Sequence, residues 1–249
     1  MTILSDLLST LPDGETVDVR VGLRWTAASV RTGGEVRIGL ASTLSAECSG
    51  ESAEEEVGAG RLLEVPARTL AGWAEEKVPL QRSIGMAALN ALLPRHPERW
   101  GDENAEEVIA RTGRGKTVTI VGCFPFVPRV RARVGKLFVL EKRPRPDTLP
   151  EEEAENCIPL SHVVAITSMT LLNGTLDQLL HLRRADATTI LLGPTTPLSP
   201  LLFERGIDFL SGSIVEDGEA VLRAVSQGAN FRQVHRAGVR LVTMRKEVG

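Results

Sequence analysis

The stretch that decides the fold is Lys116-Thr117-Val118-Thr119-Ile120-Val121-Gly122. It is a short, nearly continuous apolar run that ends in glycine, which is typical of a parallel strand covered on both faces. Further strands are expected downstream, separated by segments of helical length. The expected strands are residues 137–141, 162–167, 188–193 and 207–211, and the expected helices are residues 149–157, 173–184, 198–205 and 218–226. This alternation predicts an α/β fold with a Rossmann-like, doubly wound parallel sheet.

Upstream of this region the pattern changes. Residues 17–30 alternate like a strand, and Thr32-Gly33-Gly34 predicts a tight turn into a hairpin partner. The other expected elements are the partner strand 35–41, an exposed Ser-, Glu- and Gly-rich loop over 45–60, and helices over 66–77 and 83–93. The sequence therefore predicts two domains, a small α+β domain over 1–110 and the Rossmann-like domain over 111–249.

Composition narrows the class of protein. The chain has 249 residues, of which 42% are hydrophobic and 24% charged, as in ordinary globular proteins and unlike disordered chains. No apolar run approaches 18 residues, and the N-terminus lacks the pattern of a signal peptide. Three cysteines are too few for a disulfide framework. We therefore expect a cytoplasmic protein that does not associate with membranes.

Charge is unevenly distributed along the chain. Residues 1–110 carry 10 Lys and Arg against 18 Asp and Glu, whereas residues 111–249 carry 19 against 14. Two interpretations are open. The basic half faces an anionic ligand, or the uneven surface charge has no function. The net charge of −3, the absence of Tyr and an aromatic content of 4% argue against nucleic acid as a partner.

Ligands of open α/β sheets bind beyond the carboxyl ends of the strands. The segments expected at that edge supply most candidate ligand-binding residues, and Asn90 is added from the first domain because a partly buried Asn needs hydrogen-bond partners. The candidates are Asn90, Gly122, Cys123, Phe124, Glu141, Thr167, Ser168, Asn173, Gly174, Thr175, Gly193, Pro194, Thr195 and Thr196. Asn90 either bonds to backbone or faces a crevice between the domains.

Glu141 ends the second strand of the expected sheet, 19 residues after Gly122. In Rossmann proteins an acid at this place accepts hydrogen bonds from ribose hydroxyls, which would imply an adenosine-like or other polyol ligand. The alternative is a solvated Glu paired with Lys142 or Arg143. The first turn lacks the G-x-G-x-x-G fingerprint, since only Gly122 is present.

Asn173 is expected to cap the helix over 173–184, either as a cap alone or as part of an anion pocket with Thr167, Ser168 and Thr175. Thr195 and Thr196 stand between prolines, on a stiff loop that either contacts a ligand or only turns the chain.

Cys123 is either a nucleophile or soft metal ligand, or a buried inert thiol. The other Cys and the His residues are scattered, so a closed Cys and His zinc site is not expected. Catalytic residues, metal ligands and cofactors are left unassigned.

Five stretches together resemble the putative heavy-metal chelation family. They are residues 83–92, 121–125, 138–142, 166–175 and 192–198. The resemblance implies a Rossmann-like domain preceded by a domain similar to the enolase N-terminal fold, a ligand site between the two, and a role in metal chelation. Two functions stay open: an enzyme acting on an anionic or nucleotide-like compound, and a carrier or sensor that binds a metal, a chelator or a nucleotide-like ligand. The expected partner is a small molecule or metal chelate, and a homodimer is left open.

Overall fold

The computed structural model describes residues 2–44 and 58–247, so most of the loop expected over 45–60 lies outside the described residues. Contacts divide the chain into two compact units. Unit 1 is Met1–His96, Pro197–Ser199 and Ser213–Leu241, and unit 2 is Pro97–Thr196, Pro200–Gly212 and Val242–Gly249. The two consecutive domains expected over 1–110 and 111–249 stay a prediction.

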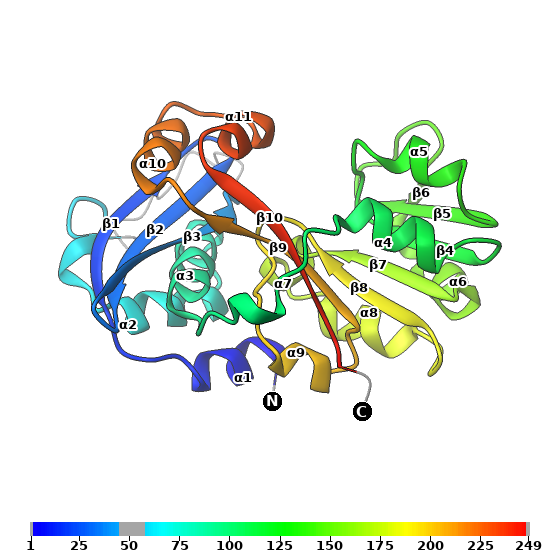
Figure 1. The fold of residues 1–249 in the computed structure, drawn as a ribbon, viewed down its shortest axis with the longest axis horizontal. Coiled ribbons are helices and arrows are strands. Elements are labelled where there is room, and N and C mark those ends of the chain that lie inside the picture. The colour runs from blue at the N-terminus through cyan, green and yellow to red at the C-terminus, as the bar shows by residue number, and fades with distance from the viewer. Residues whose placement is uncertain (1, 45–57, 248–249) are drawn as a thin grey trace. The chain divides into compact units, whose positions relative to one another are not determined.

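Unit 1 contains an antiparallel sheet of order β1-β2-β3 (Figure 1). Its strands are β1 (Glu15–Val21), β2 (Trp25–Thr32) and β3 (Glu35–Ser42), and its helices are α1 (Ile3–Ser9), α2 (Ala67–Gly72), α3 (Pro79–Leu92), α10 (Gly218–Ser226) and α11 (Phe231–Arg236), with 3-10 turns Leu62–Glu64 and Trp73–Glu75. The single strand expected over 17–30 is wrong, because the chain turns at 22–24 and gives two strands. Helix 66–77 is shorter than expected, since a 3-10 turn follows Gly72.

The sheet of unit 1 carries helices on both faces. Ala27 and Leu40 pack with Val221 and Val225 of α10. On the opposite face α3 lies directly on β3, where a Cβ added to Gly39 would stand 2.1 Å from the carbonyl oxygen of Ala87. Only glycine permits so close an approach of helix backbone to strand backbone.

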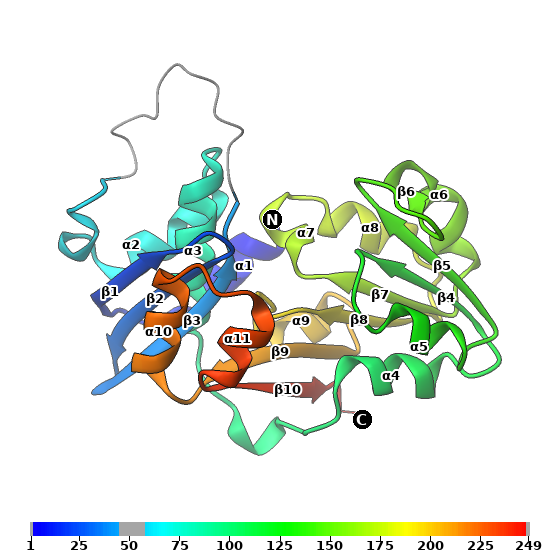
Figure 2. The same cartoon turned by 90° about the horizontal axis from the view of Figure 1, so that it is seen from above.

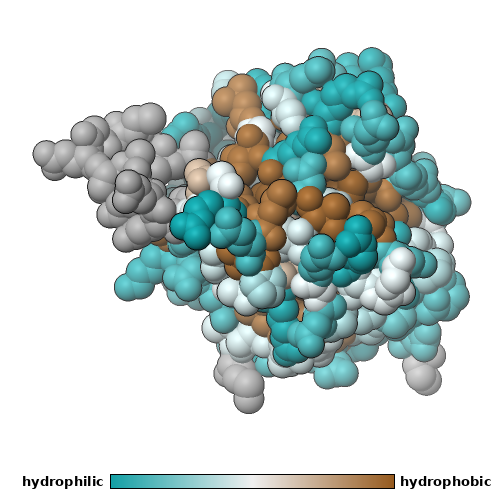
Figure 3. Space-filling view, turned by 90° about the vertical axis from the view of Figure 1, so that its left-hand side faces the viewer, coloured by the Kyte–Doolittle hydropathy of each residue, from teal (hydrophilic) through white to brown (hydrophobic). Residues whose placement is uncertain are grey.

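Some apolar surface of unit 1 stays uncovered. Figure 3 looks onto this unit and shows apolar residues gathered among polar ones. Among the described residues, the large exposed apolar side chains of unit 1 are Val21, Leu23, Val36, Leu63 and Leu241.

The larger sheet has the order β10-β9-β8-β7-β4-β5-β6 among the described residues. Its strands are β4 (Thr117–Val121), β5 (Lys136–Glu141), β6 (Leu149–Pro150), β7 (Val163–Thr167), β8 (Thr188–Leu192), β9 (Phe209–Val215) and β10 (Val239–Arg245). The pairs from β6 through β9 are parallel. The prediction of an α/β fold with a mostly parallel sheet is confirmed.

Helices of unit 2 lie on both sides of this sheet (Figure 2). They are α4 (Ala105–Thr112), α5 (Val127–Arg131), α6 (Ala154–Cys157), α7 (Met169–Leu172), α8 (Leu176–Leu182) and α9 (Leu201–Glu204), with 3-10 turns Pro97–Arg99, Glu151–Glu153 and Ile158–Leu160. The core beneath α4 and α5 contains Val118, Ile120, Val139 and Ala165. The continuous helix expected over 149–157 is wrong, because the segment starts as the short strand β6 and continues as separate turns. No helix among the described residues is both long and apolar enough to span a membrane.

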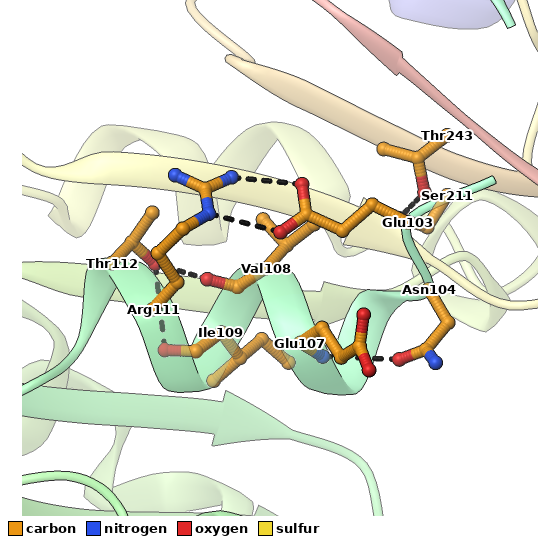
Figure 4. Close-up of polar contacts among 9 residues, drawn as sticks. All are labelled: Glu103, Asn104, Glu107, Val108, Ile109, Arg111, Thr112, Ser211 and Thr243. Carbon is orange, nitrogen blue, oxygen red and sulfur yellow. Dashed lines mark hydrogen bonds and ion pairs between the residues drawn. The ribbon is translucent and has the colours of Figure 1, made fainter. Parts of the chain in front are cut away.

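Side-chain hydrogen bonds fix both ends of α4 (Figure 4). The Oδ1 atom of Asn104 accepts the N–H of Glu107 at 3.0 Å. Arg111 makes two 2.9 Å bonds to the carboxylate of Glu103, and Thr112 donates to the carbonyl of Val108. The Asn104 bond caps the first turn of α4, and the ion pair of Arg111 with Glu103 ties the last turn to the segment that precedes the helix.

The contact of β3 with α3 gives a stability prediction. Gly39→Ala places its methyl group against backbone, which cannot move like a side chain, so we expect a loss of about 3 kcal/mol of unfolding free energy. Gly72→Ala is the matched control, because its Cβ meets nothing within 4 Å and Ala suits a helix better than Gly. Urea unfolding measures both. Equal stability of the two variants would show that the close approach does not exist.

Candidate functional site

One cavity of about 740 Å³ opens in unit 2 beyond the carboxyl ends of β4, β5 and β7. Sequence-predicted residues that line it are Gly122, Cys123, Phe124, Glu141, Thr167, Asn173 and Thr175. They come from three segments that are separate in sequence and adjacent only because the strands are parallel. The cavity therefore lies where the α/β rule places a ligand.

The Glu141 side chain joins two of these segments. One carboxylate oxygen accepts the backbone N–H of Cys123 at 2.9 Å, and the other accepts the N–H of Lys142 at 3.0 Å. The Lys142 ammonium lies 4.0 Å from Glu151, not in an ion pair with Glu141. Glu141 is thus held at the rim by backbone N–H groups.

Glycine shapes the turn after β4. Gly122 has a φ of 103°, a value that favours glycine, and a Cβ there would come within 3.1 Å of Thr167. Because Thr167 ends β7, the turn after β4 sits close against the end of the neighbouring strand. Any side chain at position 122 would push into this part of the cavity wall.

Asn173 does not head a helix, so its expected place as the N-cap is wrong. The helix expected over 173–184 is present but shorter, since α8 spans Leu176–Leu182. Helix α7 ends before Asn173, Gly174 adopts a φ of 75°, and Thr175 is the cap of α8. The Oδ1 atom of Asn173 accepts from the backbone N of Thr175 at 3.2 Å and from its hydroxyl at 2.7 Å. The Asn-Gly pair therefore makes a turn between two short helices, which its own sequence could have signalled.

Cys123 is exposed, so its interpretation as a buried thiol is wrong. Cys157 is the buried one, and desolvation together with the charge of Glu153 raises the pKa of its thiol. Among the described residues no group of three or more His, Cys, Asp and Glu could hold a metal ion. The described residues thus do not fit a heavy-metal centre.

The remaining candidates lie outside the lining of this cavity. They are Asn90, Ser168, Gly174, Gly193, Pro194, Thr195 and Thr196. Asn90 lies on α3 in unit 1, and its amide donates to the carbonyl of Leu40 at 2.9 Å. Thr195 and Thr196 are buried, and the N–H of Thr196 closes a turn onto the carbonyl of Gly193 at 3.0 Å. Their roles in ligand binding stay predictions.

Sequence reasoning missed one wall of the cavity. Glu151, Glu152 and Glu155 line it, together with Met169, Thr170, Gln178, Leu179 and Leu182. The run Glu151-Glu152-Glu153 was visible as an acidic segment. Its position depends on β6. Pro150 of this strand pairs with Glu141, and the acidic residues that follow Pro150 therefore lie at the rim of the cavity.

The turn at Asn173 can be tested by two substitutions. Asn173→Ala removes both bonds to Thr175, and we expect it to cost about 1–2 kcal/mol of unfolding free energy. Asn173→Asp keeps an acceptor oxygen and should unfold nearly like the natural protein. Chemical denaturation of both checks this, and an Ala variant as stable as the Asp variant would mean that the two bonds contribute nothing.

Comparisons with known proteins agree on the family. The family model described as "Putative heavy-metal chelation" matches residues 104–244, and a second model with the same description matches residues 4–93. An uncharacterized protein of Methanocaldococcus jannaschii is 25% identical over 217 residues, covering 84% of this chain and 82% of that protein.

Two solved structures are similar over almost the whole chain. A protein of unknown function from Desulfitobacterium hafniense, of this family, has a TM-score of 0.82 and 26% identity, with 98% of each chain covered. A family protein of unknown function from Pyrococcus horikoshii has a TM-score of 0.80 and 21% identity, with the same coverage, and supports the fold alone. The chain belongs to the family described as "Putative heavy-metal chelation".

Proposed function

We propose that this protein binds a hydroxylated, nucleoside-like small molecule in the cavity of unit 2, as part of chelator metabolism or transport. The observation that carries the proposal is the position of Glu141. This residue is the last of β5, and it lines the cavity together with Gly122 of the turn after β4. In Rossmann proteins an acidic residue at this place accepts hydrogen bonds from the ribose hydroxyls.

The sheet order supports the location. From β4 the chain proceeds to β5 and β6 on one side, and then returns to β7, β8 and β9 on the other. The reversal between β4 and β7 is the topological switch point, where α/β sheets leave room for a ligand. The cavity stands at this point, and its volume of about 740 Å³ is within the ordinary range for small-molecule sites.

Glu141 retains acceptor capacity for a ligand. A carboxylate offers about four lone-pair sites on its two oxygens. In this structure each oxygen accepts one backbone N–H, from Cys123 and from Lys142. The remaining sites can accept two hydroxyl donors, as a vicinal diol presents them.

The rest of the lining suits the flat, less polar part of such a molecule. Leu140, Met169, Leu179 and Leu182 supply apolar surface, and Phe124 supplies an aromatic ring. If the base of a nucleoside packed against this apolar surface, its sugar would point toward Glu141. Small-molecule sites commonly combine such an apolar wall with a few fixed polar groups.

A protein that binds such a ligand is either an enzyme that converts it or a carrier that only holds it. The exposed Cys123 lies in the same cavity and is the specific observation that favours an enzyme. A carrier of a nucleoside-like chelator or its precursor is the second candidate.

Calorimetric titration with adenosine tests the proposal. Glu141→Gln keeps the shape of the side chain and removes its charge, so we expect affinity to fall about 10- to 100-fold, the value of hydrogen bonds to a charged group. 2′,3′-Dideoxyadenosine should bind the natural protein with a similar loss. Glu204→Gln is the control, because Glu204 is exposed on α9 and does not line the cavity.

Two results would contradict the proposal. One is the absence of adenosine binding to the natural protein. The other is an unchanged affinity in Glu141→Gln, provided that circular dichroism shows the variant to be folded.

A further inference from the structure

The charged residues that line the cavity are strongly unbalanced in sign. Glu141, Glu151, Glu152 and Glu155 are acidic, and Lys142 is the basic residue among the described lining. Lys142 approaches Glu151 at 4.0 Å, and both side chains are about half exposed. One ammonium can offset at most one carboxylate, which leaves the cavity a net charge near −3.

The acidic wall is fixed by the fold. Strand β6 pairs in parallel with β5, so that Leu149 faces Leu140 and Pro150 faces Glu141. The acidic residues follow immediately, and the buried side chains of Ala154 and Cys157 anchor the short helix that carries Glu155. The backbone that carries these acidic residues therefore continues directly from the strand that pairs with the end of β5 at Glu141.

Basic residues nearby do not reverse this sign. Arg143 and Arg145 follow Lys142 in sequence, but neither lines the cavity. Arg131 donates to the backbone carbonyls of Leu137 and Asp147.

The start of α8 does not supply positive charge either. Its first turn carries Asp177, which opposes the helix dipole's attraction for an anion. The N–H of Thr175, its capping residue, already donates to the carbonyl of Thr170 at 2.9 Å and to Asn173. An anion would thus enter a cavity whose charged groups repel it.

We infer that the ligand class of this cavity is a nucleoside-like molecule that carries a positively charged group, and that phosphorylated nucleotides are selected against. The inference rests on the proposed function, because it assigns the charge of the ligand in the same site. The hydroxyls meet Glu141, and the cationic group reaches the rim formed by Glu151, Glu152 and Glu155. These three residues determine specificity and are not required for binding as such.

Three probes that differ only at the 5′ position of adenosine test this. They are 5′-amino-5′-deoxyadenosine, which is cationic at pH 7, adenosine, which is neutral, and adenosine 5′-monophosphate, which is anionic. Calorimetry at low salt should show the highest affinity for the amine, a lower one for adenosine and the lowest for the monophosphate. The affinities of the amine and the monophosphate should differ by at least about tenfold, because the acidic rim attracts a cation and repels an anion. The difference should shrink at 0.3 M salt, since exposed charges are screened.

A variant without the three rim carboxylates tests whether they cause this charge preference. Changing Glu151→Gln, Glu152→Gln and Glu155→Gln together should weaken the amine, strengthen the monophosphate, and leave adenosine within about twofold. The matched control changes Glu98→Gln, Glu107→Gln and Glu204→Gln, which alters the net charge of the protein equally at exposed positions outside the cavity. It should preserve the original order of the probes.

The outcomes separate the two claims. If none of the three probes binds, the proposed function falls and this inference falls with it. If adenosine binds through Glu141 but the monophosphate binds as tightly as the amine, the charge selection alone is wrong. The same conclusion follows if the rim variant and its control change the probes alike.

Discussion

The in-register parallel pairing of β4 with β5 and β7 is the constraint on which the rest of the site depends. Val121 pairs with Leu140 on one side and with Ile166 on the other. The three strands thus end at one level, and the N–H of Gly122 continues the ladder to the carbonyl of Leu140 at 2.8 Å. A shift of this register would separate Glu141 from the turn that contains Cys123, and with it remove the polar edge of the cavity.

The strands of the parallel sheet could be predicted from sequence because buried parallel strands are short apolar runs bounded by glycine or polar residues. Val118 to Val121 and Val163 to Ile166 are of this kind. The placement of Glu141 followed from the same logic, since it depends only on where β5 ends. Predicting the carboxyl edge of a parallel sheet requires no knowledge of loop conformation.

Other features depended on tertiary structure or on local backbone geometry. The Asn173 turn depends on Gly174 adopting a positive φ, which allows the Asn side chain to bond forward to Thr175. The acidic wall depends on β6, a strand of two residues that is too short for periodicity to reveal. Sequence spacing therefore predicted which strand ends the cavity adjoins, but not the sign of the charge along it, which the segment after Pro150 determines.

The central claim is that the cavity beyond β4, β5 and β7 holds a nucleoside-like ligand by its hydroxyls. A crystal structure of the protein grown with 5′-amino-5′-deoxyadenosine tests it most directly. The account predicts density in this cavity, with two sugar hydroxyls within hydrogen-bond distance of the Glu141 carboxylate. Density for the ligand elsewhere, or in the cavity with its sugar turned away from Glu141, would contradict it.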